Sequence, residues 1–257
     1  MRSDQVLSNQ KPAVVFIPGG IMPAEMAYGP LLKAIGDQIR PVTKELEVYA
    51  GDVLAPDYGL DKEVEGIRKV ADAEGFERFN LVGYSAGGAS SLAFTARYPE
   101  RLLSLALIEP AWIGRIAPED AKDWEWINQL MKLPADERMR EFQRWQMLPG
   151  VEPPALPIPA GEPPAWMKKR PAGLIAFMQA FNTYQLDTRR FKLLRGPVYF
   201  ALGSLSTRYY ARAAKTLGGL FADLQVEEYV GRSHLDPPHR TEAERFGKAM
   251  LALWKQD

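Results

Sequence analysis

The chain alternates short apolar runs with longer segments in which apolar residues recur every three or four positions. Runs rich in Val, Ile, Leu and Phe predict strands, and the longer segments predict amphipathic helices. We expect strands near residues 13–17, 42–48, 79–84, 103–108, 197–202 and 225–230, and helices near 24–36, 60–74, 86–97, 207–218 and 239–254. This alternation is typical of an α/β protein with a mostly parallel sheet of about six strands and helices on both faces.

The pattern changes between residues 110 and 195, where no strand is predicted. Two helical parts are expected, at 118–147 and 171–186. Their apolar positions are Trp124, Ile127, Leu130, Met131, Met139, Phe142, Trp145, Leu174, Phe177, Met178 and Phe181. Such side chains more often pack helix against helix than touch a ligand, although some should line a pocket. The proline-rich stretch 151–159 cannot be helical throughout, and we expect an extended strap there that could gate a site.

The pentapeptide Gly83-Tyr84-Ser85-Ala86-Gly87 lies between a predicted strand and a predicted helix. A serine at such a sharp turn is held in a strained backbone conformation that exposes its hydroxyl. Glycine two positions away on either side lets the strand and the helix pass closely. Ser85 is therefore the candidate nucleophile. The alternative is that Ser85 only caps the helix that follows, a common role for serine.

A nucleophilic serine needs a histidine base and usually a carboxylate that orients the base. The chain has two histidines. His234 follows the last predicted strand, from where its side chain can reach across the carboxyl edge of the sheet, and it is the expected base. His239 follows two prolines, and we expect it to be a solvated residue at the start of the last helix.

The motifs of this chain and their order along it resemble those of the α/β-hydrolase family, and the resemblance covers nearly the whole chain. It rests on Val14–Gly20, the serine elbow Gly83–Gly87, Leu107–Pro110, Gly196–Gly203 and the histidine loop Val230–Asp236 near the end. The resemblance implies a hydrolase core made of residues 1–109 and 196–257. It also implies a helical cap, residues 110–195, inserted over the active site.

The acid departs from the commonest pattern of that family. Members usually carry an aspartate shortly after the strand predicted at 197–202, but residues 203–208 hold no carboxylate. Some members place the acid one strand earlier, where Glu109 stands in this chain, and Glu109 is the expected acid. A carboxylate directly after an apolar strand is costly to bury unpaired, so the alternative is a structural role in a backbone network. Asp236 is a poorer candidate because it lies only two residues from His234.

Attack on an ester creates an oxyanion, which two preplaced N–H groups stabilise. The backbone N–H of Ala86 is one expected donor. By resemblance the other comes from the loop after the first strand, where many relatives have His-Gly-x and this chain has Pro18-Gly19-Gly20. Gly20 is the expected donor and Ile21 the alternative, although the two glycines would also suit a tight turn.

Composition narrows the classes of function. The chain has 257 residues, of which 46% are hydrophobic and 25% charged, and its formal net charge is zero, so a nucleic-acid partner has no electrostatic footprint. The absence of cysteine excludes disulfides and thiolate metal sites, and we expect no metal and no cofactor. Residues 1–10 lack the apolar core of a signal peptide, and no stretch is long enough to cross a bilayer. A cytoplasmic location without a membrane partner is therefore expected.

The sequence thus predicts a serine esterase of the carboxylesterase kind, which cleaves small to medium, largely apolar carboxylic esters through an acyl-enzyme on Ser85. His234 would move the proton and Glu109 would orient His234. A small-molecule ester or lactone is the expected partner. Lactone, amide, thioester and carbon–carbon bond hydrolysis stay open, as do a hydroxynitrile-lyase type of reaction and a non-catalytic receptor. The serine argues against dehalogenase and epoxide hydrolase chemistry, which need a carboxylate nucleophile.

Overall fold

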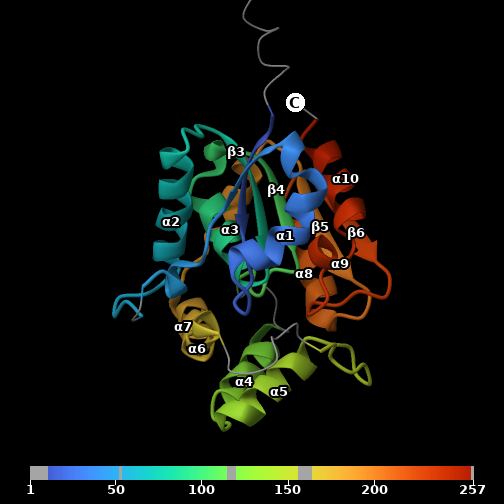
Figure 1. Ribbon diagram of the computed structural model, residues 1–257. Helices are drawn as coiled ribbons and strands as arrows, with labels where there is room; N and C mark the ends of the chain where they lie inside the picture. Colours follow the sequence, from blue (N-terminus) through green and yellow to red (C-terminus); the bar gives the residue numbers. More distant parts are fainter. Residues whose placement is uncertain (1–10, 52–53, 115–119, 156–163, 256–257) are drawn as a thin grey trace, which may run out of the picture.

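The computed structural model describes residues 11–51, 54–114, 120–155 and 164–255, and these form a six-stranded sheet (Figure 1). The strand order is β2-β1-β3-β4-β5-β6, and every neighbouring pair is parallel. The strands are β1 (Ala13–Ile17), β2 (Arg40–Thr43), β3 (Phe79–Tyr84), β4 (Leu102–Ile108), β5 (Val198–Gly203) and β6 (Leu224–Tyr229). The predicted parallel sheet of six strands is confirmed.

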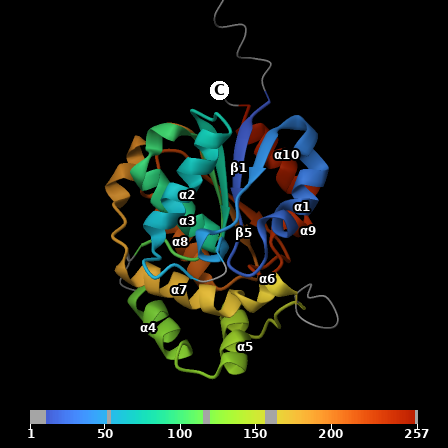
Figure 2. The same ribbon diagram turned by 60° about the vertical axis from the view of Figure 1, so that its left-hand side comes forward.

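Helices cover both faces of this sheet (Figure 2). On one face lie α2 (Leu60–Ala73), α3 (Ala86–Arg97) and α8 (Arg208–Gly218), and on the other lie α1 (Ala24–Ile35), α9 (Pro238–Thr241) and α10 (Ala243–Leu253). Successive residues of a strand point to opposite faces, so Val15 and Ile17 of β1 join one apolar cluster and Val14 and Phe16 the other. Because both faces of the sheet are buried, each strand needs apolar residues at successive positions, and this explains the continuous apolar runs in the sequence.

One predicted strand, residues 42–48, is wrong in its extent. β2 ends at Thr43, and Glu47–Tyr49 form the short 3-10 helix η3 instead. The reason is Glu63 of α2, which is fully buried and accepts hydrogen bonds from the N–H groups of the first two η3 residues at 3.0 and 3.1 Å. Those N–H groups are thereby taken from sheet pairing, and the chain turns toward α2.

The other predicted elements are present with small shifts at their ends. The predicted helix at 239–254 is divided into α9 and α10 at Glu242, whose backbone (φ −128°, ψ 45°) is not helical. The short 3-10 helix η2 (Gly36–Gln38) follows α1, and another, η4 (Pro99–Arg101), comes directly before β4. Of the helices in the described residues, none has both the length and the apolar composition that crossing a membrane requires.

A group of helices is inserted between β4 and β5. The described residues there form α4 (Asp120–Leu130), α5 (Ala135–Trp145), α6 (Ala165–Lys168), α7 (Arg170–Thr183) and the 3-10 helix η5 (Thr188–Leu193), with no strand among them. Helices α4 to α7 lie together beyond one end of the sheet, drawn at the bottom of Figures 1 and 2. Of the predicted strap, residues 151–155 form neither helix nor strand, and the rest lies outside the described residues.

Candidate active site

Ser85 occupies a strained turn between β3 and α3. Its backbone has φ 53° and ψ −116°, and Ser85 and Glu109 are the two non-glycine residues with positive φ in the described part of the chain. A Cβ on Gly83 would lie 2.6 Å from the Gly87 carbonyl oxygen, and a Cβ on Gly87 would collide with the carbonyl of Ile17. The close passage predicted at the elbow is therefore present. The Ser85 hydroxyl makes no capping hydrogen bond within the described residues, so the capping alternative is wrong.

A continuous hydrogen-bonded relay joins the three predicted residues. His234 Nε2 lies 3.0 Å from Ser85 Oγ, and His234 Nδ1 lies 3.1 Å from Glu109 Oε2. The side chains of His234 and Glu109 are each about 3% exposed. A carboxylate next to Nδ1 favours the tautomer with its proton on Nδ1, which leaves Nε2 as an acceptor for the serine hydroxyl. The geometry is that of an activated nucleophile.

Glu109 reaches this position because β4 and β5 are neighbours in the sheet. It follows β4 directly with φ 43°, and its Oε1 accepts a hydrogen bond of 2.7 Å from the N–H of Gly203, the last residue of β5. A Cβ at Gly203 would lie 2.6 Å from the carbonyl oxygen of Arg232, so the histidine loop packs closely on the same strand end. The carboxylate of Glu109 thus lies at the end of β5, where residues 203–208 supply no acid.

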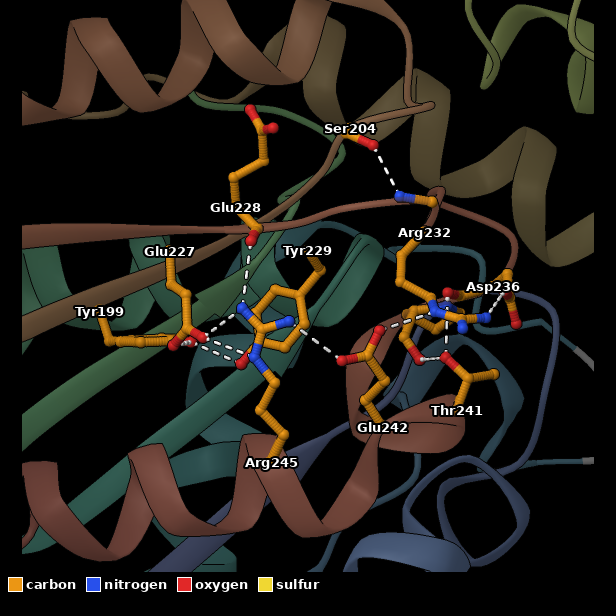
Figure 3. Close-up of polar contacts among 12 residues, drawn as sticks. Tyr199, Ser204, Glu227, Glu228, Tyr229, Arg232, Asp236, Thr241, Glu242 and Arg245 are labelled. Carbon is orange, nitrogen blue, oxygen red and sulfur yellow. Dashed lines mark hydrogen bonds and ion pairs between the residues drawn. The ribbon is translucent and has the colours of Figure 1, made fainter.

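An ion-pair network holds the loop that carries His234 (Figure 3). Arg232 pairs with Asp236 at 2.7 Å and with Glu242 at 2.8 Å, and Arg245 pairs with Glu242 at 3.1 Å and with Glu227 at 2.7 Å. The hydrogen bond from Arg232 lowers the pKa of Glu242. Single exposed pairs contribute little, but here several charges lock one loop to α10 and β6. The carboxylate of Asp236 faces Arg232, as expected from its poor position for reaching His234.

Two tyrosines contact the His234 imidazole, and the sequence did not indicate them. Tyr210 of α8 stacks on it with 4.5 Å between ring centroids and 7° between the planes, and its hydroxyl donates to Gln146 Oε1 at 2.5 Å. Tyr84 lies 5.1 Å away and donates to the His234 carbonyl oxygen at 2.5 Å. Burial raises the pKa of both phenols, so they stay neutral. Tyr84 could have been noticed inside the elbow motif, whereas nothing local marks Tyr210.

The expectation that His239 is solvated is wrong. It lies at the start of α9 as predicted, but it has no exposed surface and packs 4.9 Å from each of the Tyr28 and Tyr84 rings. Both ring nitrogens lack a hydrogen-bond partner in the described residues. Burial lowers the pKa of His239 well below its ordinary value. α9 packs against α1, which turns the side chain inward beneath Tyr84.

The predicted oxyanion donors line the same pocket as Ser85 and His234. Gly20, Ile21 and Ala86 are all part of its wall. Ala86 is the first residue of α3, and the first N–H groups of a helix have no acceptor within that helix. The loop of Gly20 is fixed from outside by Tyr49 of η3, whose hydroxyl donates to the Gly20 carbonyl oxygen at 2.8 Å.

The inserted helices form much of the wall of this pocket, which we call the Ser85 pocket. Its volume is about 60 Å³. The inserted segment contributes Trp124, Ile127, Phe142, Trp145, Gln146, Leu174, Phe177, Met178 and Phe181. No Asp, Glu, Lys or Arg is part of the wall among the described residues. The predicted helical stripes therefore serve both packing and lining, and the arrangement suits an uncharged, apolar molecule.

Comparison with known proteins places this architecture in a family. Residues 12–142 match the family model described as alpha/beta hydrolase fold. The chain therefore belongs to the α/β-hydrolase fold family, as its motifs indicated. The matched range contains the elbow, β1 to β4, all of α4 and most of α5.

Individual known proteins match this chain either over short stretches or at low sequence identity. A stretch of 78 residues is 36% identical to 2-hydroxy-6-oxo-6-phenylhexa-2,4-dienoate hydrolase of Comamonas testosteroni, and it spans 30% of this chain and 27% of that relative. The crystal structure of naproxen esterase (carboxylesterase NP) from Bacillus subtilis superposes with a TM-score of 0.65 at 17% identity, covering 96% of this chain and 85% of that one. MenH from S. aureus superposes with a TM-score of 0.71 at 14% identity, covering 96% and 95%. At these identities the structural likeness is one of fold.

Proposed function

We propose that this protein is a serine hydrolase of uncharged, largely apolar carboxylic esters. The single observation that carries the proposal is the relay from Ser85 Oγ through His234 to Glu109, with contacts of 3.0 and 3.1 Å. The relay opens into an apolar pocket that also contains two backbone donor positions. This combination is what acyl transfer to a serine requires.

In the acylation half of the proposed reaction, Ser85 Oγ attacks the ester carbonyl carbon while His234 Nε2 removes the hydroxyl proton. The carbonyl oxygen becomes an oxyanion that accepts hydrogen bonds from the N–H of Ala86 and from Gly20 or Ile21. The imidazolium then gives its proton to the leaving alkoxide, the ester C–O bond breaks, and an acyl-Ser85 remains. Glu109 holds the imidazole and stabilises its cationic form.

In the deacylation half, a water molecule takes the place of the alcohol. His234 removes a proton from the water as its oxygen attacks the acyl carbon, and it returns the proton to Ser85 Oγ as the acid leaves. The free enzyme is restored, and the balance requires only ester and water. No step needs a metal or an organic cofactor.

The inserted helices are proposed to form a cap domain over this site. Gln146 at the end of α5 accepts a hydrogen bond from Tyr210, which stacks on His234, and Leu174 of α7 lies against Gly20. Both parts of the insertion therefore touch residues next to the reacting groups. A wall supplied by an inserted segment separates the reaction from bulk water. The proposed boundaries are residues 110–195 for the cap and 1–109 and 196–257 for the core.

A second candidate, carbon–carbon bond hydrolysis, is favoured by the names of relatives. Those matched over short stretches include hydrolases named for 2-hydroxy-6-oxodienoates, and a meta-cleavage product hydrolase is among the similar structures. A dienoate carries a carboxylate, and burying it without a partner is costly. The Ser85 pocket has no Lys or Arg in its described wall to balance that charge, which supports neutral esters instead.

The test is a panel of p-nitrophenyl esters, lactones and 2-hydroxy-6-oxodienoates, assayed with the wild type and with Ser85→Ala. We expect multiple turnovers on neutral esters by the wild type and a loss of at least about a thousandfold in Ser85→Ala, judged from the effect of removing a serine nucleophile. Equal rates in both proteins would overturn the proposal. Faster turnover of the dienoate than of every ester would establish the second candidate.

A further inference from the structure

A larger apolar cavity lies beside the Ser85 pocket. Its volume is about 290 Å³, against about 60 Å³ for the Ser85 pocket. We call it the side chamber, and define it by the residues that line it without lining the Ser85 pocket, chief among them Met22, Leu130, Met131, Met139, Met167 and Ile175. The reaction itself needs room only at the scissile bond, so the mechanism leaves this volume unexplained.

The two cavities share a wall. Ile21, Phe142, Leu174 and Met178 line both of them. Leu174 lies directly over the loop of Gly20 and Ile21, which we call the oxyanion loop, since its Cδ2 would be 2.7 Å from a Cβ at Gly20. Leu174 and Met178 are only partly buried, and unbranched or singly branched side chains can change rotamer at small cost. Two of the four shared residues, Leu174 and Met178, can therefore move, and none of the four belongs to a strand.

The side chamber borders the loop of Gly20 and Ile21 and not His234. In the proposed mechanism the leaving alcohol must lie next to His234 Nε2, which protonates it. His234, Tyr210 and Gln146 line the Ser85 pocket, and in the described residues none of the three lines the side chamber. The chamber instead borders Ile21 of the oxyanion loop. A group that extends from the carbonyl carbon away from His234 enters the side chamber.

The lining suits a flexible hydrocarbon chain. Met22, Met131, Met139, Met167 and Met178 line the chamber, out of nine methionines in the chain. Methionine adapts its shape to different apolar occupants, so a methionine-rich wall accepts chains of several lengths.

The charged residues of the chamber are already engaged. Arg170 pairs with Glu45 at 3.0 Å and lies 3.9 Å from the centroid of the Tyr49 ring, and Arg138 donates to the carbonyl oxygen of Leu133 at 2.8 Å. The ion pair with Glu45 balances the charge of Arg170, which disfavours a second anion beside it. Among the described residues, Arg138 Nε and Arg170 Nε and Nη1 are buried without a hydrogen-bond partner, so the test below includes an anionic acyl group. An uncharged chain is the occupant that fits.

We infer that the side chamber binds the acyl chain of the substrate and makes the enzyme selective for straight-chain acyl groups longer than butyryl. This inference rests on the proposed ester hydrolysis and deepens it. Each further methylene that the chamber buries raises kcat/KM by up to about fourfold. Acetyl and butyryl esters occupy the Ser85 pocket alone.

The test fills the chamber without touching the reacting residues. Ile175→Trp and Met131→Trp place a large ring in it from α7 and from the residue after α4, and neither residue lines the Ser85 pocket. Leu193→Trp is the matched control, since Leu193 is 50% exposed on η5 and lines neither cavity. The substrates are p-nitrophenyl acetate, butyrate, octanoate and dodecanoate below their aggregation limits. A second series keeps the acetyl group and lengthens the alcohol from ethyl to octyl.

In the wild type and in Leu193→Trp we expect kcat/KM to rise from acetate to octanoate. In each chamber variant the ratio of octanoate to acetate kcat/KM should fall at least about tenfold. The acetate rate should stay within about twofold, which shows that the variant is folded. An unchanged ratio in both variants overturns the inference while ester hydrolysis stands.

Other outcomes also decide the question. Loss of octyl acetate hydrolysis with octanoate unaffected would assign the chamber to the alcohol and overturn the inference. So would faster cleavage of an ω-carboxyoctanoyl ester than of the octanoyl ester, because it would show recognition of an anion by the two arginines. If the wild type cleaves no ester, acetate included, the proposed function fails and the inference fails with it.

Discussion

The sheet core and the inserted helices each form one side of the Ser85 pocket. The side chains on these two sides are held in place by different interactions. On the core side, Ser85 and Glu109 have strained backbones, and Glu109 Oε1 and Oε2 each have a hydrogen-bond partner. On the insertion side, the wall is made mostly of aromatic and aliphatic side chains, with Gln146 as its polar member. Hydrogen bonds have narrow geometry, whereas apolar contacts tolerate rearrangement.

In the proposed reaction, this difference separates two tasks. Atoms that move protons must be placed to within a fraction of an ångström, and the core side supplies that precision. Recognition of an apolar group requires only volume and apolar surface, and the insertion side supplies those. Substitutions in the core side should therefore lower the rate for every ester, and substitutions in the insertion should change which ester is preferred.

After Ser85→Ala, the largest effect is expected from Glu109→Gln on the core side. The neutral amide keeps the size of the side chain but cannot stabilise the imidazolium of His234, so kcat should fall more than about a hundredfold for all esters alike. Steady-state kinetics on acetate and octanoate esters would measure it. Thermal unfolding provides the control, because Glu109 Oε1 also accepts from Gly203. A near-normal kcat in a folded variant would show that another group orients His234.

A smaller effect is expected at Tyr210, where the two regions join. Tyr210→Leu removes the ring stacked on His234, and Tyr210→Phe keeps the ring but loses the hydroxyl bonded to Gln146. Stacked aromatic pairs contribute about 0.5–1.5 kcal/mol, so kcat should fall about two- to tenfold in the leucine variant and recover in the phenylalanine variant. Equal losses in both variants would instead make the link to α5 the important feature.

The smallest effect on activity is expected at His239, which packs under Tyr84 and influences stability instead. Burial keeps His239 neutral in the folded protein, whereas the unfolded chain binds a proton there below pH about 6.5. Stability is therefore retained above this pH and lost as the pH falls, by up to about 1.4 kcal/mol per pH unit. His239→Phe preserves the packing against Tyr28 and Tyr84 and should flatten this dependence.

The measurement is urea unfolding of the wild type and His239→Phe from about pH 7.5 to pH 5. Other groups titrate equally in both proteins, so the difference between the two curves isolates His239. Parallel curves would mean that the imidazole is protonated in the folded state, or that its site opens to water.

The relation between sequence and structure differs along the chain. Five predicted strands lie within one residue of their expected ends, because strands buried on both faces are continuous apolar runs. The remaining predicted strand, residues 42–48, is too long at its end. The carboxylate of Glu63, which is fifteen or more residues away in the sequence, accepts hydrogen bonds from the N–H groups at the start of η3. Local hydrophobicity cannot report a hydrogen bond from another element.

The sequence by itself determined the sheet and the elbow, and it selected the residues that the structure brings into the relay. These features depend on local constraints: burial on two faces, a serine turn that demands glycines, and residues placed at strand ends. It did not determine the stacked Tyr210, the buried ring of His239 or the side chamber. Those arise where side chains from distant elements meet, and only the packing of the whole chain decides which of them touch.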